Sequence, residues 1–190
     1  MNLLLLLISS ILINNIVLMQ FLGLCSFFGV STKMKSVVGM GLAVIVVITL
    51  SALITWPLYK FVLLPLNIAY IDTIAFILVI ASLVQLTELV IKRVSHSLYK
   101  ALGVYLPLIA TNCAVLGVAL QNVAVDKTYP VAIIYALGSA LGYAFIIIVF
   151  AAIRIRLDSA NVPRALKGLP IAFITASLMA LAFMGLGGMI

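Results

Sequence analysis

Long apolar runs separated by short polar segments make up almost the whole chain. A helix that crosses a membrane needs about 20 mostly apolar residues, and the sequence contains six such runs. They lie near Leu3–Leu22, Val37–Tyr59, Ala69–Ile91, Leu98–Leu120, Val131–Ile153 and Gly168–Ile190. The pattern therefore predicts an all-α integral membrane protein with six transmembrane helices.

The six runs fall into two halves, residues 1–95 and 96–190, with three predicted helices each. Because three is an odd number, the second half would cross the membrane in the opposite sense to the first. Each half contains the sequence Cys-x-x-x-Gly-Val, at Cys25–Val30 and Cys113–Val118, and 88 residues separate the two cysteines. We predict two inverted three-helix repeats, an architecture that builds a site near the bilayer midplane from broken helices.

The two cysteines would lie at different depths if the first and fourth helices were continuous. At about 1.5 Å of rise per residue, Cys25 would lie roughly 33 Å from Leu3, and Cys113 roughly 20 Å from Lys100. Both segments contain residues that favour a break in a helix. These residues are Gly23, Gly29, Pro107 and Gly117. We therefore predict broken half-helices in the first and fourth spans, which would bring the cysteines to one level.

Composition and charge agree with a membrane location. The chain is 66% hydrophobic and 8% charged, which leaves too few charged residues to cover a soluble domain. Its net charge of +7 comes from basic residues in short loops, so we expect no nucleic-acid partner. Nine basic residues, Arg154 among them, lie in the first, third and fifth loops, against Lys60 and Lys127 on the other side. This asymmetry predicts that those three loops are cytoplasmic and that both termini lie outside.

Polar side chains inside the runs are costly in lipid and usually face the bundle interior or a cavity. The candidates for a functional role are Asn14, Asn15, Asp72, Gln85, Thr87, Glu88, Thr111 and Asn112. Hydrogen bonding to a neighbouring helix is the ordinary role for most of them, and Asp72 is interpreted as a solvated helix-start residue. Glu88 precedes Lys92 by one helical turn. An i,i+4 ion pair with Lys92 and a role in cation passage are equally weighted interpretations of Glu88. Residues Glu88, Asn14 and Asn15 are the candidates for an ion path.

The cysteines are the principal chemical signal. With two cysteines, no C-x-x-C pair and a single histidine, His96, the chain fits neither a disulfide framework nor a zinc knuckle. Packing is the ordinary role of such cysteines, but the repeated motif and the nearby breakers favour a site. Two thiolates do not complete an iron–sulfur cluster, because a [2Fe–2S] centre takes four protein ligands. A metal site would need a second chain, and no residue of this chain is assigned a catalytic role.

Three stretches carry a resemblance to a known family: Asn14-Asn15, Phe21–Ser31 and Leu106–Gly117. They resemble the A subunit of the Rnf complex, which is similar to the E subunit of the Na⁺-translocating NADH:quinone reductase. The likeness covers essentially the whole chain in length, predicted spans and motif positions. It implies a membrane subunit of an ion-pumping ferredoxin:NAD⁺ oxidoreductase in a prokaryotic cell (inner) membrane, without enzyme activity of its own.

The resemblance also implies a shared cofactor. In that family this subunit packs as an inverted pair with the homologous Rnf E subunit, and each contributes two cysteines to one iron–sulfur centre. The ligands implied here are Cys25 and Cys113, around a centre expected to be [2Fe–2S], although four thiolates also suit a [4Fe–4S] centre or a single iron. The expected surroundings are Gly23, Leu24, Ser26, Thr111, Asn112 and Gly117. Further partners would be the B, C, D and G subunits. No flavin is expected, since the chain lacks a Ser-Gly-Ala-Thr type motif.

Three functions follow from these observations. The first is relay of single electrons across the membrane, coupled to Na⁺ or H⁺ because added negative charge is poorly tolerated in a low-dielectric bundle. The second is a small secondary transporter, for which inverted repeats with broken helices are also expected. The third is a structural subunit that scaffolds redox partners, with packing cysteines. Tolerance of serine at Cys25 and Cys113 would favour the second, and absence of iron the third.

Overall fold

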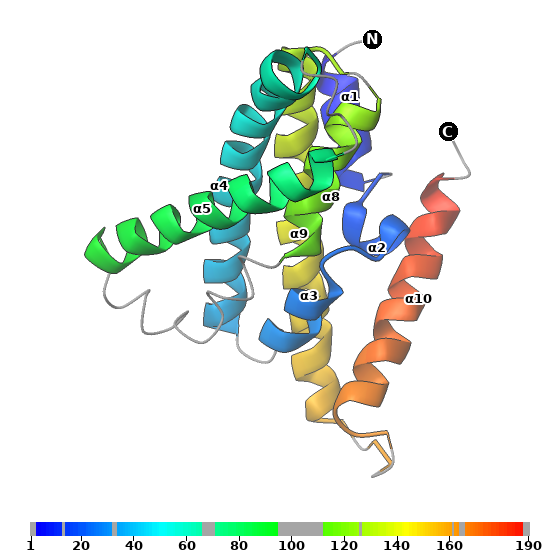
Figure 1. Cartoon of the computed structure of the whole chain (residues 1–190). Helices are drawn as coiled ribbons and strands as arrows, with labels where there is room; N and C mark the ends of the chain where they lie inside the picture. Colours follow the sequence, from blue (N-terminus) through cyan, green and yellow to red (C-terminus); the bar gives the residue numbers. More distant parts are fainter. Residues whose placement is uncertain are drawn as a thin grey trace.

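A computed structural model describes residues 3–12, 14–31, 34–65, 71–94, 112–125, 127–160, 162–163 and 166–187. Within these ranges the chain is helical, and the predicted all-α fold is confirmed (Figure 1). The first half contains α1 (Leu3–Leu12), α2 (Ile16–Gln20), α3 (Leu24–Val30), α4 (Met34–Leu58), the π-helical segment η1 (Tyr59–Leu63) and α5 (Asp72–Val94). The second half contains α8 (Cys113–Ala124), α9 (Tyr129–Asp158) and α10 (Leu169–Gly187).

Three helical segments are long and apolar enough to cross a membrane: Met34–Leu63, Asp72–Val90 and Tyr129–Asp158. They correspond to the predicted second, third and fifth spans. Shorter apolar helices cover Cys113–Ala124, which runs four residues past the predicted fourth span, and Leu169–Gly185, which lies within the predicted sixth span. The described chain therefore has three helices with the length and composition of membrane spans, while the count of six and the inverted repeat stay predictions.

The centre of the bundle is the antiparallel pair α4 and α9 (Figure 1). α4 together with η1 forms a segment of 30 residues, α9 alone also has 30, and the two segments begin 95 residues apart. Small residues let the helices approach closely, as in other membrane bundles. A Cβ atom added to Gly41 would lie 3.4 Å from the Cβ of Ala144.

The other helices pack around this pair. α1 lies against α9, where a Cβ on Gly142 would lie 2.8 Å from the carbonyl oxygen of Ile11, so a side chain at this position would push the helices apart. α8 packs on α4, α10 contacts α2 and α9, and α5 contacts α4 and α8. α5 leaves the bundle at an angle, and much of its surface is exposed (Figure 1).

The first apolar run is broken, as predicted, but the breaks lie only partly where they were expected. α1 ends at Leu12, and α2 begins after Asn15. Phe21 and Gly23 then adopt left-handed backbone conformations, with φ of 55° and 82°, before α3 starts. The predicted break at Gly29 is wrong, because Gly29 lies inside α3. A glycine with right-handed φ only weakens a helix, whereas a run of left-handed residues ends it.

The fourth run is interrupted just before Cys113. Asn112 has an extended backbone, with φ −73° and ψ 112°, and α8 begins at the next residue. The predicted break at Gly117 is wrong, because Gly117 lies inside α8. Gly117 instead leaves room for Leu22 because it has no side chain. A Cβ at this position would lie 2.5 Å from Leu22 Cδ1. The predicted break at Pro107 lies outside the described residues.

The two lysines predicted on the outer side come together at one end of the bundle. Trp56 Nε1 donates a 2.7 Å hydrogen bond to the carbonyl oxygen of Lys127, and Lys60 Nζ lies 5.1 Å from the centroid of the Trp56 ring. The Tyr129 ring lies 5.1 Å from the same indole. α1 begins and α10 ends toward this end (Figure 1), as expected for an even number of crossings.

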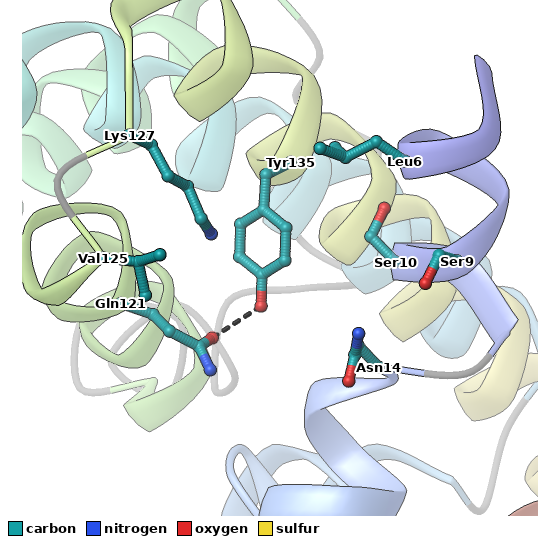
Figure 2. Close-up of a pocket in the computed structure, with 8 residues that line it drawn as sticks. All are labelled: Leu6, Ser9, Ser10, Asn14, Gln121, Val125, Lys127 and Tyr135. Carbon is teal, nitrogen blue, oxygen red and sulfur yellow. Dashed lines mark hydrogen bonds between the residues drawn. The ribbon is translucent and has the colours of Figure 1, made fainter. Parts of the chain in front are cut away.

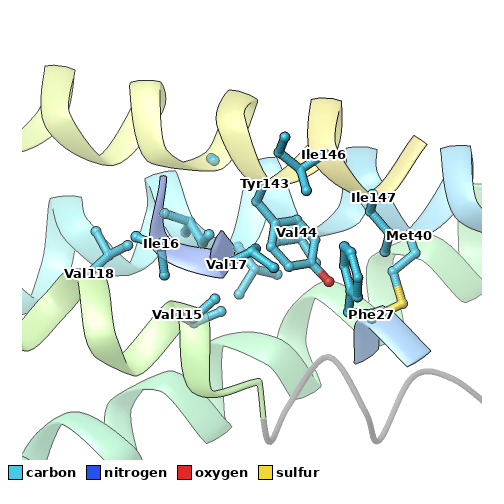
Figure 3. Packing of buried hydrophobic residues seen from close by; sticks show 14 of the residues in the cluster. Ile16, Val17, Phe27, Met40, Val44, Val115, Val118, Tyr143, Ile146 and Ile147 are labelled. Carbon is cyan, nitrogen blue, oxygen red and sulfur yellow. The ribbon is translucent and has the colours of Figure 1, made fainter. Parts of the chain in front are cut away.

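The buried core lies where α2, α3, α4, α8 and α9 meet (Figure 3). Its members are almost all aliphatic or aromatic. They include Ile16, Val17, Phe27, Met40, Val44, Val115, Val118, Tyr143, Ile146 and Ile147. This core joins both broken segments to the central pair, so it fixes where the two cysteine-bearing helices begin.

Candidate functional site at the starts of two short helices

Cys25 is the second residue of α3, and its side chain is exposed. The residue before α3 is Gly23, which has φ of 82° and caps the helix without a side-chain hydrogen bond. Ser26 is buried, and its hydroxyl donates a 2.8 Å hydrogen bond to the carbonyl oxygen of Gly23. This bond closes the sharp turn from α2 into α3.

Cys113 is the first residue of α8, and it is also exposed. Asn112 caps this helix: its side-chain oxygen Oδ1 accepts a 3.1 Å hydrogen bond from the backbone N–H of Ala114. Asparagine is among the best residues for this role, because its oxygen satisfies an N–H group that has no partner within the helix. A short local rule thus places the second cysteine at a helix start.

The two helix starts touch. A Cβ on Gly23 would lie 3.1 Å from Asn112 Oδ1 and 3.2 Å from the Cβ of Ala114. Gly23 is two residues before Cys25, while Asn112 and Ala114 flank Cys113. The breaks in the two runs therefore bring both cysteine segments to one place. Glycine is required at position 23 by its positive φ and by this close contact.

α9 holds α3 through side chains along its length. The hydroxyls of Tyr143 and Ser26 are 2.7 Å apart and hydrogen-bonded, and Figure 3 shows the Tyr143 hydroxyl pointing into the space beside Phe27. The Phe27 ring stacks on Phe150 with centroids 4.2 Å apart. These contacts fix the face of α3 opposite its exposed cysteine.

Arg154 of α9 holds the other end of α3. Its Nη1 atom donates to the carbonyl oxygen of Phe28 at 2.9 Å and to Ser31 Oγ at 2.6 Å. The placement of Arg154 in a cytoplasmic loop is wrong: α9 continues to Asp158, and Arg154 is only 9% exposed. A cation at the C-terminal end of a helix satisfies carbonyl groups that have no partner within the helix.

Most of the predicted surroundings of the cysteines lie at this contact. Gly23, Leu24 and Ser26 form the start of α3, Asn112 caps α8, and Gly117 packs on Leu22 one turn into α8. Thr111 lies outside the described residues. Sequence reasoning missed Tyr143 and Arg154, whose only signal was a hydroxyl and a charge on an otherwise apolar helix.

The donor set at the contact is incomplete for a metal. Within the described ranges, no group of three or more His, Cys, Asp or Glu side chains lies close enough to hold an ion. Thiolates suit soft metals and iron–sulfur clusters. The two cysteines are half of a four-thiolate set, so a metal centre here would need further ligands from another chain.

A second polar feature is a cavity of about 320 Å³ between α1, α8 and α9 (Figure 2). Its lining is Leu6, Ser9, Ser10, Asn14, Gln121, Val125, Lys127 and Tyr135. The Tyr135 hydroxyl donates a 2.5 Å hydrogen bond to Gln121 Oε1, and Lys127 Nζ lies 3.1 Å from the centroid of the Tyr135 ring. Lys127 lies between α8 and α9, and burial lowers its pKa to about 8.

The three candidates for an ion path lie in different surroundings, and their role in ion passage stays a prediction. Asn14 lines the cavity, whereas Asn15 is buried and caps α2. Glu88 lies on α5 and does not line the cavity. The interpretation of Asp72 is confirmed, since it begins α5 and its Oδ1 accepts the N–H of Thr73 at 2.5 Å.

The fold and the site define a class: a helical membrane protein in which breaks in two apolar runs bring two segments, each with an exposed cysteine, into contact. A family model described as "Rnf-Nqr subunit, membrane protein" matches residues 3–190. The chain is 53% identical over 189 residues to the A subunit of the Na(+)-translocating ferredoxin:NAD(+) oxidoreductase complex of Acetobacterium woodii, covering 100% of this chain and 98% of that one. It is 54% identical over 187 residues to the A subunit of the ion-translocating oxidoreductase complex of Aeromonas salmonicida, covering 98% and 97%.

The chain belongs to the Rnf-Nqr family and, within it, to the A subunits of Rnf complexes. The resemblance found in the Asn14-Asn15, Phe21–Ser31 and Leu106–Gly117 stretches is thereby confirmed. The chain is a membrane subunit of an ion-translocating oxidoreductase complex, and it is a component of an enzyme that consists of several subunits.

Proposed function

We propose that this chain supplies half of the ligands of an iron–sulfur centre that relays electrons across the membrane. The observation that carries the proposal is the contact between the two helix starts, where Gly23 meets Asn112 and Ala114. Cys25 and Cys113 would be the two ligands from this chain. The homologous Rnf E subunit, packed in the inverted sense, would supply two more and complete a [2Fe–2S] set. The B, C, D and G subunits would carry the electron further.

The residues around the cysteines have distinct tasks in this proposal. When bound, the centre supplies one-electron transfer. Gly23 keeps the two backbones close, and Tyr143 and Arg154 hold α3 so that Cys25 stays at a fixed place. The two exposed thiols leave an open side for the partner's ligands.

Ion coupling would follow from the added charge. An electron that enters a low-dielectric bundle is better tolerated when a cation follows it. The breaks at Phe21–Gly23 and at Asn112 are where the chain can respond by a small backbone change. Na⁺ is the first ion to test, since the relative from Acetobacterium woodii is named as Na(+)-translocating; H⁺ is the other candidate.

The orientation in the membrane is part of the proposal. The loops rich in lysine and arginine would be cytoplasmic, and both termini would lie outside. The cluster of Trp56, Lys60, Lys127 and Tyr129 would then mark the outer end, where aromatic side chains gather at membrane interfaces.

A transporter without electron transfer is the second candidate function. The observation that favours it is the polar cavity beside Asn14, Gln121 and Lys127, which is large enough for a small solute or a hydrated ion. In that case the cysteines would be packing residues. Transport would then survive their replacement, which separates the two candidates.

The test is iron content and EPR of the purified complex in wild type, Cys25→Ser and Cys113→Ser. We expect a reducible iron signal that either substitution abolishes while the complex still assembles. Ser177→Ala is the matched control, because Ser177 is exposed on α10 and its hydroxyl donates to the carbonyl oxygen of Phe173 in the same helix. An unchanged iron signal in both cysteine variants would contradict the proposal, and transport that persists in them would favour the second candidate.

A further inference from the structure

The polar cavity between α1, α8 and α9 carries one positive charge. Lys127 is in its lining, and no acidic side chain is among the described residues that line it. The chain has four acidic residues: α5 carries Asp72 and Glu88, and Asp158 lies at the far end of α9. The fourth, Asp126, lies outside the described residues. A fixed ammonium group repels a second cation and attracts an anion, so the lining favours an anionic ligand over a metal ion.

Lys127 is held at the cavity by its neighbours. Its Nζ lies 3.1 Å from the centroid of the Tyr135 ring and donates a 3.5 Å hydrogen bond to Asn122 Oδ1. Its backbone carbonyl oxygen accepts the Nε1–H of Trp56. Burial lowers the pKa of Lys127 to about 8, which leaves the amine mostly protonated at pH 7. An ammonium group has three N–H donors, so Lys127 keeps a donor for a ligand beside Tyr135 (Figure 2).

Neutral hydrogen-bond donors line the cavity around Lys127. The Tyr135 hydroxyl donates to Gln121 Oε1, so the group that Gln121 keeps for a ligand is its NH₂. Figure 2 shows Asn14 on the opposite wall with its amide toward the cavity, and Ser9 adds a hydroxyl group. One ammonium with amide and hydroxyl donors can bind several oxygen atoms of one anion, as a phosphate group requires.

The cavity lies at the end of the bundle where a membrane interface is expected. The rings of Trp56 and Tyr129 are 5.1 Å apart at this end, and such side chains gather at the level of lipid headgroups. Apolar surface adjoins the polar lining, since Val125 of the lining and Ile8 of α1 are both exposed. A ligand that combines a phosphate group with apolar chains would match both kinds of surface.

We propose that this cavity binds the phosphate group of a membrane phospholipid, with Lys127 as the charged contact and Gln121 and Asn14 as further donors. Basic pockets between membrane helices bind lipid headgroups in this way. A free phosphate ion offers the same headgroup chemistry but lacks the acyl chains that would contact the exposed apolar surface. The inference is independent of the iron–sulfur centre, and a lipid seated here would fill the space considered above for a transported solute.

The test is a binding titration of the full chain in a detergent without phosphate. Trp56 is the only tryptophan of the chain, and its hydrogen bond to Lys127 makes its fluorescence a local reporter. The probes are a short-chain phosphatidylglycerol, the diacylglycerol with the same acyl chains, and inorganic phosphate. We expect a saturable change with phosphatidylglycerol, weaker binding of the other two probes, and a loss of affinity of about fivefold in Lys127→Gln.

Lys60→Gln is the matched control. It removes an equal charge beside the same indole, but Lys60 does not line the cavity, so the affinity for phosphatidylglycerol should stay unchanged. If Lys127→Gln fails to fold by circular dichroism, Asn14→Leu decides, because it removes a neutral donor at an exposed position and should also weaken binding.

Three results would overturn the inference. The first is an unchanged affinity for phosphatidylglycerol in folded Lys127→Gln or, where that variant does not fold, in Asn14→Leu. The second is equally tight binding of diacylglycerol, which would show that the phosphate group is not recognised. The third is equally tight binding of inorganic phosphate, which would assign the cavity to a free anion in place of a lipid. None of these results bears on the iron content of the complex, so the proposed function is tested separately.

Discussion

The two helices that carry the cysteines are held in place by different means. α3 has seven residues and a glycine cap without a side-chain bond, and it is hydrogen-bonded to α9: Ser26 and Tyr143 are 117 positions apart, and Phe28 and Arg154 are 126 apart. α8 has twelve residues and is capped by the residue that precedes it, Asn112. The start of α3 therefore has no local side-chain cap and is anchored by distant residues, whereas the start of α8 is fixed by its neighbouring residue.

This difference shows that a repeated motif need not be built in the same way twice. The long helices α4 and α9 begin 95 residues apart, but the cysteines are 88 residues apart. Cys25 accordingly lies nine residues before Met34, in a helix of seven residues, whereas Cys113 lies 16 residues before Tyr129 and opens a helix of twelve. Both cysteines are exposed and lie at the start of a helix. The contact of Gly23 with Asn112 and Ala114 joins these two helix starts.

The largest loss of stability is expected from replacing Gly23, which caps α3 and contacts the start of α8. Gly23→Ala would force a side chain into a left-handed conformation and into contact with Asn112, Ala114 and Tyr143. We expect the free energy of unfolding to fall by roughly 2–4 kcal/mol, the sum of left-handed strain and overpacking. The measurement is denaturant unfolding of the full chain in detergent, followed by circular dichroism.

Gly29→Ala is the matched control for Gly23→Ala. Gly29 is exposed and lies inside α3, so alanine should be neutral or should stabilise the helix by up to about 1 kcal/mol. Equal destabilisation by both substitutions would mean that Gly29 is also a required break, contrary to the structure.

Arg154→Met should loosen α3 and leave α8 unchanged. It removes two hydrogen bonds from a buried charged group, to Phe28 and Ser31, and we expect a loss of about 2–3 kcal/mol. Hydrogen exchange followed by mass spectrometry should show faster exchange in residues 24–30 and unchanged exchange in residues 113–124. Arg156→Met, at an exposed position on the same helix, is the control and should change neither segment. Equal loosening of both segments would contradict the comparison.

The features of this site that depend on neighbouring residues could be predicted from the sequence, and those that depend on distant residues could not. Asn112 before Cys113 is a local pattern, since an asparagine caps the helix that follows it, although the breaks in this run were predicted at Pro107 and Gly117 instead. The all-α fold was likewise predictable, because each apolar run is a local feature. The anchoring of α3 by Tyr143 and Arg154 was not, since no local rule pairs residues more than a hundred positions apart. For the same reason the sequence placed Arg154 in a loop.

Tyr143→Phe tests one bond of α3. The Tyr143 hydroxyl is bonded to Ser26, which keeps a second bond to the carbonyl oxygen of Gly23. We expect a loss of about 1 kcal/mol, and a double-mutant cycle with Ser26→Ala should give a coupling energy of similar size. The control is Tyr135→Phe, which breaks a bond to Gln121 away from α3 and should leave exchange in residues 24–30 unchanged. A coupling energy near zero would mean that the two hydroxyls do not depend on each other.

The smallest expected effect is on the pH dependence of stability and concerns Lys127, a cation near the C-terminal end of α8, as Arg154 is near the C-terminal end of α3. Arg154 serves α3, whereas Lys127 follows α8: its backbone N–H donates to the carbonyl oxygen of Asn122 at 3.3 Å, and its Nζ lies 3.5 Å from Asn122 Oδ1. Burial lowers the pKa of Lys127 from 10.5 to about 8, so between these two pH values the unfolded chain binds more protons than the folded chain. Stability should therefore rise slightly from pH 8 to pH 10.5, by a small amount because the group is only about half buried. Lys127→Gln does not titrate, and the difference between the unfolding curves of wild type and this variant isolates the effect. A difference that stays constant across this pH range would show that Lys127 keeps its ordinary pKa.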